Sequence, residues 1–371
     1  MSGRIRYVDL AAQYAEERAA LESRIGACLS EGQWVGGALV AELERSLAAR
    51  CGARFAVTLG SGTDALIFAL QALGIGAGDE VVTAPNSFVA TAAAIVAVGA
   101  RPVFADVGPD RNLDPAAVAS KLTPRTRAIL PVHLGGRIAA MPELLALAAE
   151  HGIPLVEDAA QAFGSTLGRR YAGTFGRVGC FSAHPLKNLN ACGDAGFVVT
   201  DDEELATAIR QLGNNGLRDR DTLARWGRVS RLDVVQAAIL QFRLERLDAI
   251  LAARRRNAAF YDAHLDRRHV AWPAFEPDVD RRVDTYHTFI VEVDRRDALR
   301  AWLLDRGIET NIHYPVPIHL QPPAAALGYR RGDFPVVEAQ AARILSLPVH
   351  PYLTPDDLAR VVDGIHAFYE R

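Results

Sequence analysis

The stretch FAVTLGSGTDALIFAL, residues 55–70, begins as a short apolar strand and continues as a helix that opens at Ser61–Asp64. The same order recurs downstream, with apolar runs at 80–85, 101–107, 127–133 and 153–158 and helical segments at 88–98, 115–121 and 141–150. Short, continuous apolar runs are typical of strands buried on both faces, and helices between such strands make βαβ units. The sequence therefore predicts an α/β fold with a largely parallel sheet covered by helices.

Beyond residue 201 the pattern becomes helical, and the long stretch 231–265 resembles a connector between two domains. A second, smaller α/β unit follows, with strands expected at 287–293 and near 309–313 and helices at 295–306, 334–344 and 354–370. We therefore predict a large domain over residues 1–245 and a small C-terminal domain over residues 246–371.

Composition excludes several classes of protein. The 41 basic and 44 acidic residues leave a net charge of −3, which does not suit a nucleic-acid surface or a polybasic membrane anchor. The first residues, 1–17, lack a signal-peptide core, and no apolar run reaches the roughly 18 residues of a membrane helix, so we expect a cytoplasmic location. The four cysteines are scattered and there is no HExxH motif, so we expect no metal. GIGAG (74–78) does not have GxGxxG spacing and reads as a helix end and turn, not a dinucleotide loop.

Ser61–Asp64 lies between an expected strand and an expected helix, where glycine lets another group approach the backbone closely. The free N–H groups and the positive end of the helix dipole would make this turn a phosphate-binding site. Taken alone, the same residues also suit an ordinary helix N-cap.

Asp158 ends the expected strand IPLVED (153–158), and strand alternation points it away from its neighbour Glu157. A carboxylate at the carboxyl end of a parallel strand can pair with a protonated ring nitrogen, and Gln161 can hydrogen-bond to a neighbouring oxygen. The simpler interpretation of Asp158 is a helix-capping residue.

Lys121 and Lys187 are the only lysines in the chain. Lys121 lies in the polar segment ASKLTPRTR (119–127), which indicates a solvated loop. Lys187 lies among small and apolar residues before a glycine-rich turn, where desolvation would lower its pKa and make the amine nucleophilic, as Schiff-base chemistry requires. Taken alone, Lys187 also suits a surface lysine with a buried stem.

The order of these motifs, a phosphate turn, an aromatic residue, an acid and an amine, matches what pyridoxal phosphate needs. The chain resembles the DegT/StrS family of sugar aminotransferases over nearly its whole length. The motifs that carry the resemblance include SGTDALIFAL (61–70), VEDAAQAFGS (156–165), FSAHPLKNLNACGDAG (181–196) and HYPVPIHLQ (313–321). The resemblance implies a fold-type I architecture, an α/β/α sandwich with a mostly parallel sheet plus a smaller C-terminal α/β domain, and a homodimer.

The resemblance also implies roles for individual residues. Lys187 would bind the coenzyme covalently and act as general acid and base, and Asp158 would pair with the pyridinium nitrogen. The other implied coenzyme contacts are Gly62, Thr63 and Ser182 to the phosphate, Phe88 to the ring face and Gln161 to the phenolic oxygen. The implied substrate contacts are Tyr14, His184, His313, Tyr314 and His319.

Two departures from the family pattern stand out. Where relatives often carry an asparagine that reaches the phosphate in the neighbouring subunit, this chain has Val229, and Arg228 is a candidate to compensate. Some relatives that deoxygenate sugars have histidine where this chain has Lys187. The lysine therefore favours transamination over pyridoxamine-dependent dehydration.

The expected reaction converts a keto sugar, nucleotide-linked and of the 3-keto-6-deoxy type, into an amino sugar, with L-glutamate as donor and pyridoxamine phosphate as the intermediate form of the coenzyme. Asp194, in the segment GDAG (193–196), resembles the pattern of relatives that aminate C3. The alternatives are a C4-type or longer-chain keto sugar or cyclitol, a sugar dehydratase, and a non-catalytic regulator on the same fold.

Overall fold

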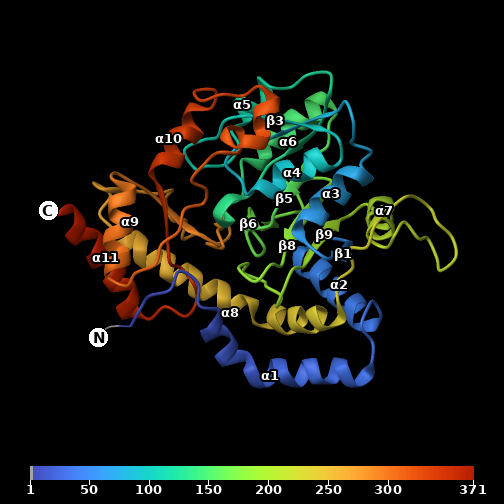
Figure 1. Ribbon diagram of the computed structural model, residues 1–371, viewed down its shortest axis with the longest axis horizontal. Coiled ribbons are helices and arrows are strands. Elements are labelled where there is room, and N and C mark those ends of the chain that lie inside the picture. Colours follow the sequence, from blue (N-terminus) through green and yellow to red (C-terminus); the bar gives the residue numbers. More distant parts are fainter. Residues whose placement is uncertain (1–2) are drawn as a thin grey trace.

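A single seven-stranded sheet forms the centre of the molecule in the computed structural model, which describes residues 3–371 (Figure 1). Its strands are β1 (Phe55–Leu59), β2 (Glu80–Thr83), β3 (Arg101–Phe104), β4 (Thr126–Leu130), β5 (Val156–Asp158), β8 (Val178–Ser182) and β9 (Gly196–Thr200). The order β3-β2-β4 continues into β5-β8-β9-β1 through parallel bridges that pair Ile129 with Leu155 and Val132 with Asp158. Only β9 runs antiparallel to both of its neighbours, so the mostly parallel sheet is confirmed.

Two apolar cores cover the two faces of this sheet, because adjacent residues of each strand point to opposite sides. One face packs under α3 (Gly62–Ala72), α4 (Val89–Ala97) and α7 (Glu203–Gly213). The other packs against α2 (Ala38–Cys51), α6 (Met141–His151) and the first half of α8 (Val234–His264). The alternation is visible in Val198, which faces the first core, and Val199, which faces the second. Strands covered on both sides account for the continuous apolar runs of the sequence.

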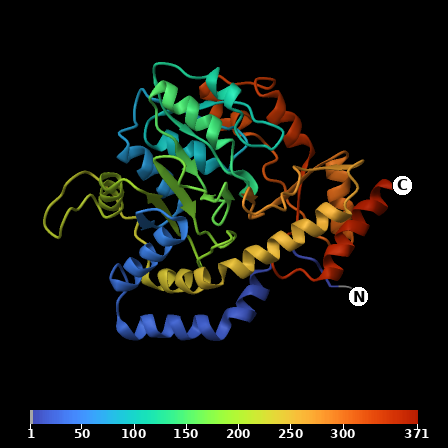
Figure 2. The same ribbon diagram turned by 180° about the vertical axis from the view of Figure 1, so that it is seen from behind.

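Helix α8 is 31 residues long and joins the two halves of the molecule. Figures 1 and 2 show it running beneath the sheet toward the C-terminal unit, with α1 (Leu10–Glu31) alongside its first half. Ala237 and Leu240 belong to the core of the large unit, whereas Ala258 and Tyr261 belong to the core of the small one. The domain boundary after residue 245 stays a prediction, and the helix passes through that position without a break.

The C-terminal unit is built on a three-stranded antiparallel sheet of β10 (Val270–Ala271), β12 (Phe289–Val293) and β13 (Ile344–Leu347). Helices α9 (Arg296–Asp305), α10 (Pro335–Arg343) and α11 (Pro355–Tyr369) complete it. The strand expected near 309–313 does not form, because Asn311 makes only a single bridge to Ser346 before the chain turns away through Pro315 and Pro317, which have no N–H for a ladder. Ile5 bridges to Ile308 and belongs to this core, so the N-terminal segment packs with the C-terminal unit.

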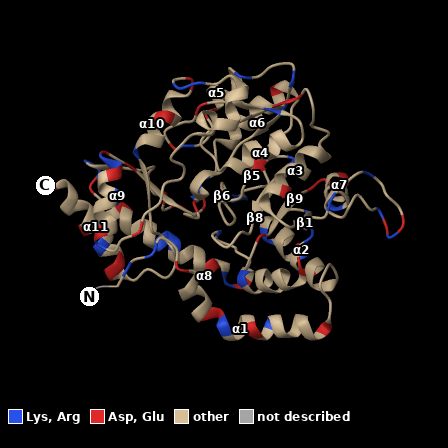
Figure 3. Cartoon of the chain, viewed as in Figure 1, with Lys and Arg blue, Asp and Glu red and all other residues tan. Residues whose placement is uncertain are grey.

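The remaining elements are short and lie at the edges. They are α5 (Pro115–Ala119), the small sheet of β6 (Thr166–Leu167), β7 (Arg170–Tyr171) and β11 (Arg282–Val283), and the 3₁₀ turns Leu134–Gly136, Ile318–Leu320 and Pro322–Leu327. Charged residues of both signs gather on the outer helices and loops, and the central strands carry few (Figure 3). Within residues 3–371, no helix is both long and apolar enough to cross a membrane.

Candidate active site

A cavity of about 460 Å³ lies at the carboxyl ends of the sheet strands, where ligands of such sheets bind. It brings together ten of the residues predicted from the sequence: Gly62, Thr63, Phe88, Asp158, Gln161, Ser182, His184, Lys187, His313 and Tyr314. The predicted coenzyme contacts come from four separate stretches of the chain, so the fold is what makes them one site.

The turn before α3 opens into this cavity. Ser61 is the N-cap of α3, with its Oγ accepting from the backbone N–H of Asp64 at 3.0 Å, so the capping interpretation of this residue is correct. A Cβ on Gly62 would come within 2.6 Å of the Ser182 Cβ, so only glycine lets Ser182 lie this close to the start of the helix. The N-cap does not prevent phosphate binding at this turn, because Gly62 and Thr63 line the cavity at the start of the helix, where backbone N–H groups have no partner within the helix.

Arg228, the candidate to compensate for Val229, makes its contacts with residues of its own chain. The Asp64 carboxylate accepts from Arg228 Nη2 at 2.7 Å and from Ser230 Oγ at 2.8 Å, and the Arg228 guanidinium lies 5.0 Å from the centre of the Phe68 ring. Val229, next to it, is 60% exposed. Its loop between α7 and α8 projects from the body of the molecule in both views (Figures 1 and 2).

Asp158 lies at the end of β5 and is almost fully buried. One carboxylate oxygen accepts from Thr91 Oγ1 at 2.7 Å and the other from the Ala160 backbone N–H at 3.2 Å. Burial raises the pKa of Asp158, and these two hydrogen bonds act in the opposite direction. Glu157 points to the other face of the sheet, where it pairs with His133 Nε2 at 2.9 Å, as strand alternation predicts.

Lys187 lies in the loop between β8 and β9, on the same cavity as Asp158. Burial of the ammonium group lowers the pKa of Lys187 to about 8, and the negative charge of Asp158 opposes this shift. About a tenth of the amine is therefore neutral and nucleophilic at pH 7, far more than for a lysine with its ordinary pKa. Lys121 lies outside the cavity, with its Nζ 5.9 Å from the centre of the Phe334 ring.

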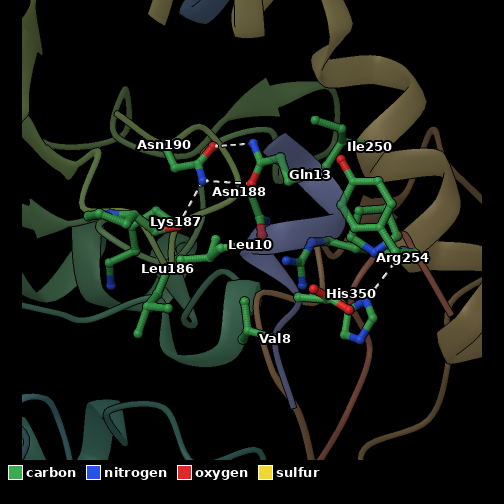
Figure 4. Close-up of a pocket in the computed structure, with 14 residues that line it drawn as sticks. Val8, Leu10, Gln13, Leu186, Lys187, Asn188, Asn190, Ile250, Arg254 and His350 are labelled. Atoms are coloured by element: carbon green, nitrogen blue, oxygen red, sulfur yellow. Dashed lines mark hydrogen bonds between the residues drawn. The ribbon is translucent and has the colours of Figure 1, made fainter. Parts of the chain in front are cut away.

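A buried polar network fixes the loop that carries Lys187 (Figure 4). Asn190 Nδ2 donates to Pro185 O at 2.7 Å and to Gln13 Oε1 at 3.0 Å, and Gln13 Nε2 donates back to Asn190 Oδ1 at 3.0 Å. Arg243 donates through Nη1 to Asn190 O at 2.7 Å and through Nε and Nη2 to Glu17 Oε2 at 2.9 and 2.7 Å. Helices α1 and α8 are thereby tied to the Lys187 loop. This network could not be predicted from the sequence, because none of its members is marked by a local motif.

Phe88 and Tyr314 both line the cavity, and their rings contact each other with centres 5.8 Å apart. Gln161 Nε2 donates to Tyr314 Oη at 3.3 Å, and Gln161 Oε1 accepts from the Gly135 N–H at 2.7 Å. His313 pairs through Nδ1 with Ser346 Oγ at 2.8 Å, and burial lowers its pKa to about 4. His313 is therefore a neutral hydrogen-bonding group at pH 7.

Two predicted substrate contacts do not line this cavity. Tyr14 lies on α1, 48% exposed, and donates to Glu22 Oε1 at 2.8 Å, while its neighbour Gln13 faces inward. His319 is buried, and its Nε2 lies 3.1 Å from Glu338 Oε1. Their role as sugar contacts stays a prediction.

Another part of the cavity wall was not anticipated from the sequence. It comes from the N-terminal segment, the second half of α8 and the C-terminal unit, through Tyr7, Arg254, His287, Thr288, Asn311 and His350. Burial lowers the pKa values of His287 and His350. Arg254 is one of three consecutive arginines in an arginine-rich chain, so nothing in the sequence distinguishes it as a residue of the site.

The residues present fit pyridoxal phosphate. The helix start with Gly62 and Ser182 offers donors for a phosphate, Phe88 offers a ring face, Asp158 offers a buried anion for the ring nitrogen, and Lys187 offers an amine of lowered pKa. All of them line one cavity that is large enough for a coenzyme and part of a substrate.

Comparison with known proteins finds relatives over nearly the whole length of the chain. A "dTDP-3-amino-3,4,6-trideoxy-alpha-D-glucose transaminase" of Streptomyces venezuelae is 42% identical over 370 residues, covering 99% of this chain and 97% of the relative. A "pleiotropic regulatory protein" of Geobacillus stearothermophilus is 38% identical over 363 residues, covering 98% of both chains. The crystal structure of S. venezuelae DesV in complex with a ketimine intermediate superposes with a TM-score of 0.96 at 41% identity, covering 100% of both chains.

The family model of the DegT/DnrJ/EryC1/StrS aminotransferases matches residues 15–366, which is nearly the whole chain. With the relatives and the shared fold, this match shows that the chain belongs to the DegT/DnrJ/EryC1/StrS aminotransferase family.

Proposed function

We propose that this protein uses pyridoxal phosphate to convert a nucleotide-linked 3-keto-6-deoxy sugar into the corresponding 3-amino sugar, with L-glutamate as the amino donor. The observation that carries the proposal is the placement of Lys187 and Asp158 on one cavity with the phosphate-binding turn before α3. Pyridoxal phosphate, when bound, supplies an electron-withdrawing ring that stabilises negative charge on the reacting carbon.

The residues of the chain supply the remaining requirements. The helix start at Gly62 and Thr63, with Ser182, would anchor the phosphate group. Asp158, with both oxygens hydrogen-bonded, would hold a positive charge on the ring nitrogen by a charge-assisted bond. The Nζ atom of Lys187, neutral above about pH 8, would accept a proton from the reacting carbon and return it to the neighbouring position.

Two observations support amination at C3. Asp194, in the GDAG segment that resembles C3-aminating relatives, lines the cavity. The S. venezuelae relative is named as a transaminase of a 3-amino sugar. C4-type keto sugars, longer-chain keto sugars and cyclitols are the alternative substrates.

We further propose a homodimer as the functional unit. The loop between α7 and α8 exposes Leu223 (47%), Trp226 (87%) and Val229 (60%), and exposed apolar side chains of this size are typical of a surface that another chain covers. The cytoplasmic location expected from the sequence also stays a prediction.

A regulatory role is the second candidate, because the G. stearothermophilus relative carries a regulator's name. The test is to load the protein with pyridoxal phosphate, add L-glutamate, and then add a panel of nucleotide-linked 3-keto and 4-keto sugars. Under the proposal, glutamate changes the coenzyme absorbance, and mass spectrometry detects the amino product from the 3-keto sugar first.

Each other outcome has its own meaning. Amination of the 4-keto sugar alone would move the proposed position to C4, and release of ammonia with a deoxygenated product would indicate a dehydratase. If glutamate leaves the absorbance unchanged and no sugar is converted, the regulatory role replaces the proposed one.

A further inference from the structure

Arg254 is a buried cation on the part of the cavity wall that comes from the second half of α8, and only 7% of it is exposed. Its Nη1 donates to two backbone carbonyls, Tyr286 O at 3.1 Å and His287 O at 3.3 Å. Among residues 3–371, no carboxylate forms an ion pair with it, and its Nε has no hydrogen-bond partner. Figure 4 shows its side chain reaching from α8 toward the part of the site where Lys187 lies.

Burial of a guanidinium without an anion is costly, so the arrangement calls for an explanation. Burial lowers the pKa of Arg254 to about 10, which still leaves it positively charged at neutral pH. The neighbouring His287, His313 and His350 have lowered pKa values, so near pH 7 they contribute hydrogen-bonding groups and not charge. The fixed positive charge on this wall of the cavity is therefore that of Arg254.

Two further buried polar atoms, on residues that line the same cavity as Arg254, also have no partner within the described chain. They are His287 Nδ1 and Thr288 Oγ1, and both residues line the same cavity. Buried polar groups are normally hydrogen-bonded, so unpaired ones on the same cavity as an unpaired cation point to a polar, negatively charged ligand.

We propose that Arg254 binds the carboxylate of a substrate, an inference that rests on the proposed transaminase function. A planar guanidinium suits a carboxylate, because two parallel N–H groups can engage its two oxygens. The coenzyme phosphate is not the occupant, because the phosphate-binding turn is formed by Gly62, Thr63 and Ser182 on the large-unit side of the cavity. The carboxylate belongs either to the α-amino acid donor or to an acidic keto sugar, a uronate.

The test compares Arg254→Gln with Arg255→Gln. Arg255 is the matched control, since it also lies on α8 and donates to backbone carbonyls, Asp284 O at 3.4 Å and Glu276 O at 3.3 Å, but does not line the cavity. Calorimetry on the pyridoxal phosphate-loaded protein would measure binding of glutarate, a dicarboxylate that has no amino group to react. Arg254→Gln should weaken glutarate binding about tenfold to a hundredfold, and Arg255→Gln should leave it unchanged.

Single half-reactions distinguish the two sources of the carboxylate. If the donor binds at Arg254, the variant slows the reaction of the pyridoxal form with L-glutamate and spares that of the pyridoxamine form with keto sugars. If a uronate binds there, the variant slows the step with the 3-keto uronate and spares the neutral 3-keto sugar.

Equal glutarate affinity in Arg254→Gln and the unaltered protein would overturn the proposal, as would a loss of pyridoxamine phosphate binding in the variant. If Arg254→Gln does not fold, the unaltered protein supplies the test, because it should bind glutarate at least about tenfold more tightly than the uncharged diamide. Equal binding of the two would also overturn the proposal. Glutarate binding is measured without turnover, so failure of the transaminase proposal would appear separately, as an absence of product in the unaltered protein.

Discussion

Arg243 and Arg254 lie on the same side of helix α8, eleven residues and about three turns apart, and both are buried. Arg243 is fully engaged, with Glu17 as its counter-ion and the Asn190 carbonyl as a second acceptor. Arg254 has two carbonyls and no counter-ion among the described residues. The difference teaches that the same residue type on the same helix can have two tasks. Arg243 holds the Lys187 loop in place, whereas Arg254 is left free to pair with the carboxylate of a bound substrate, as proposed above.

The largest expected effect concerns the group that the Arg243 network holds. Lys187→Ala should reduce turnover on the order of 10⁴-fold or more, because no other amine lines the described cavity. Transamination kinetics would measure the loss, and chemical denaturation should show a nearly unchanged free energy of unfolding. Lys121→Ala is the control and should keep full activity, and retained turnover in Lys187→Ala would refute the assignment.

The next effect tests the paired arginine. Glu17→Ala leaves Arg243 buried without its counter-ion and should lower the free energy of unfolding by about 3–5 kcal/mol. Glu16→Ala is the control, since Glu16 forms an exposed ion pair with Arg246 that is worth about 0–1 kcal/mol. Equal losses in the two variants, measured by urea unfolding, would show that Arg243 does not depend on Glu17.

A smaller effect follows from the pKa of Lys187. This pKa is lowered from its ordinary value of 10.5 to about 8, so below pH 8 the folded protein holds mainly the protonated, unreactive amine. The rate of covalent capture of pyridoxal phosphate by the coenzyme-free protein should therefore rise about tenfold per pH unit up to about pH 8 and then level off. Stopped-flow absorbance would measure it, and a rise that continues unchanged to about pH 10 would show that burial does not activate this lysine.

The smallest expected effect concerns the unpaired arginine. Arg254→Gln should change the free energy of unfolding of the ligand-free protein by no more than about 1 kcal/mol, because removal of an uncompensated buried charge offsets the loss of its two carbonyl contacts. Arg243→Gln, in contrast, leaves Glu17 buried without a counter-ion and should lower the free energy of unfolding by about 3–5 kcal/mol. If the two arginine variants lose equal stability, the contrast between them fails.

The sequence predicts the parts of the site that local motifs carry, and misses those that depend on distant partners. The alternation of strands and helices and the order of Gly62, Asp158 and Lys187 are local, and the structure brings these residues to one cavity. Glu17 and Arg243 are 226 residues apart, and nothing local distinguishes them from the exposed pair Glu16 and Arg246. How much each ion pair contributes to stability depends on its burial, and burial is known only once the chain has folded.

Helix α8 also sets a rule for exchanging parts between members of the family. Its 31 residues pass from one apolar core into the other, so the helical phase fixes how the two units face the shared cavity. One residue inserted between Arg243 and Arg254 would rotate everything beyond it by about 100° and advance it by about 1.5 Å. A chimaera joined within this helix therefore has to conserve its residue count, whereas the projecting loop between α7 and α8 offers a junction where length is far less constrained.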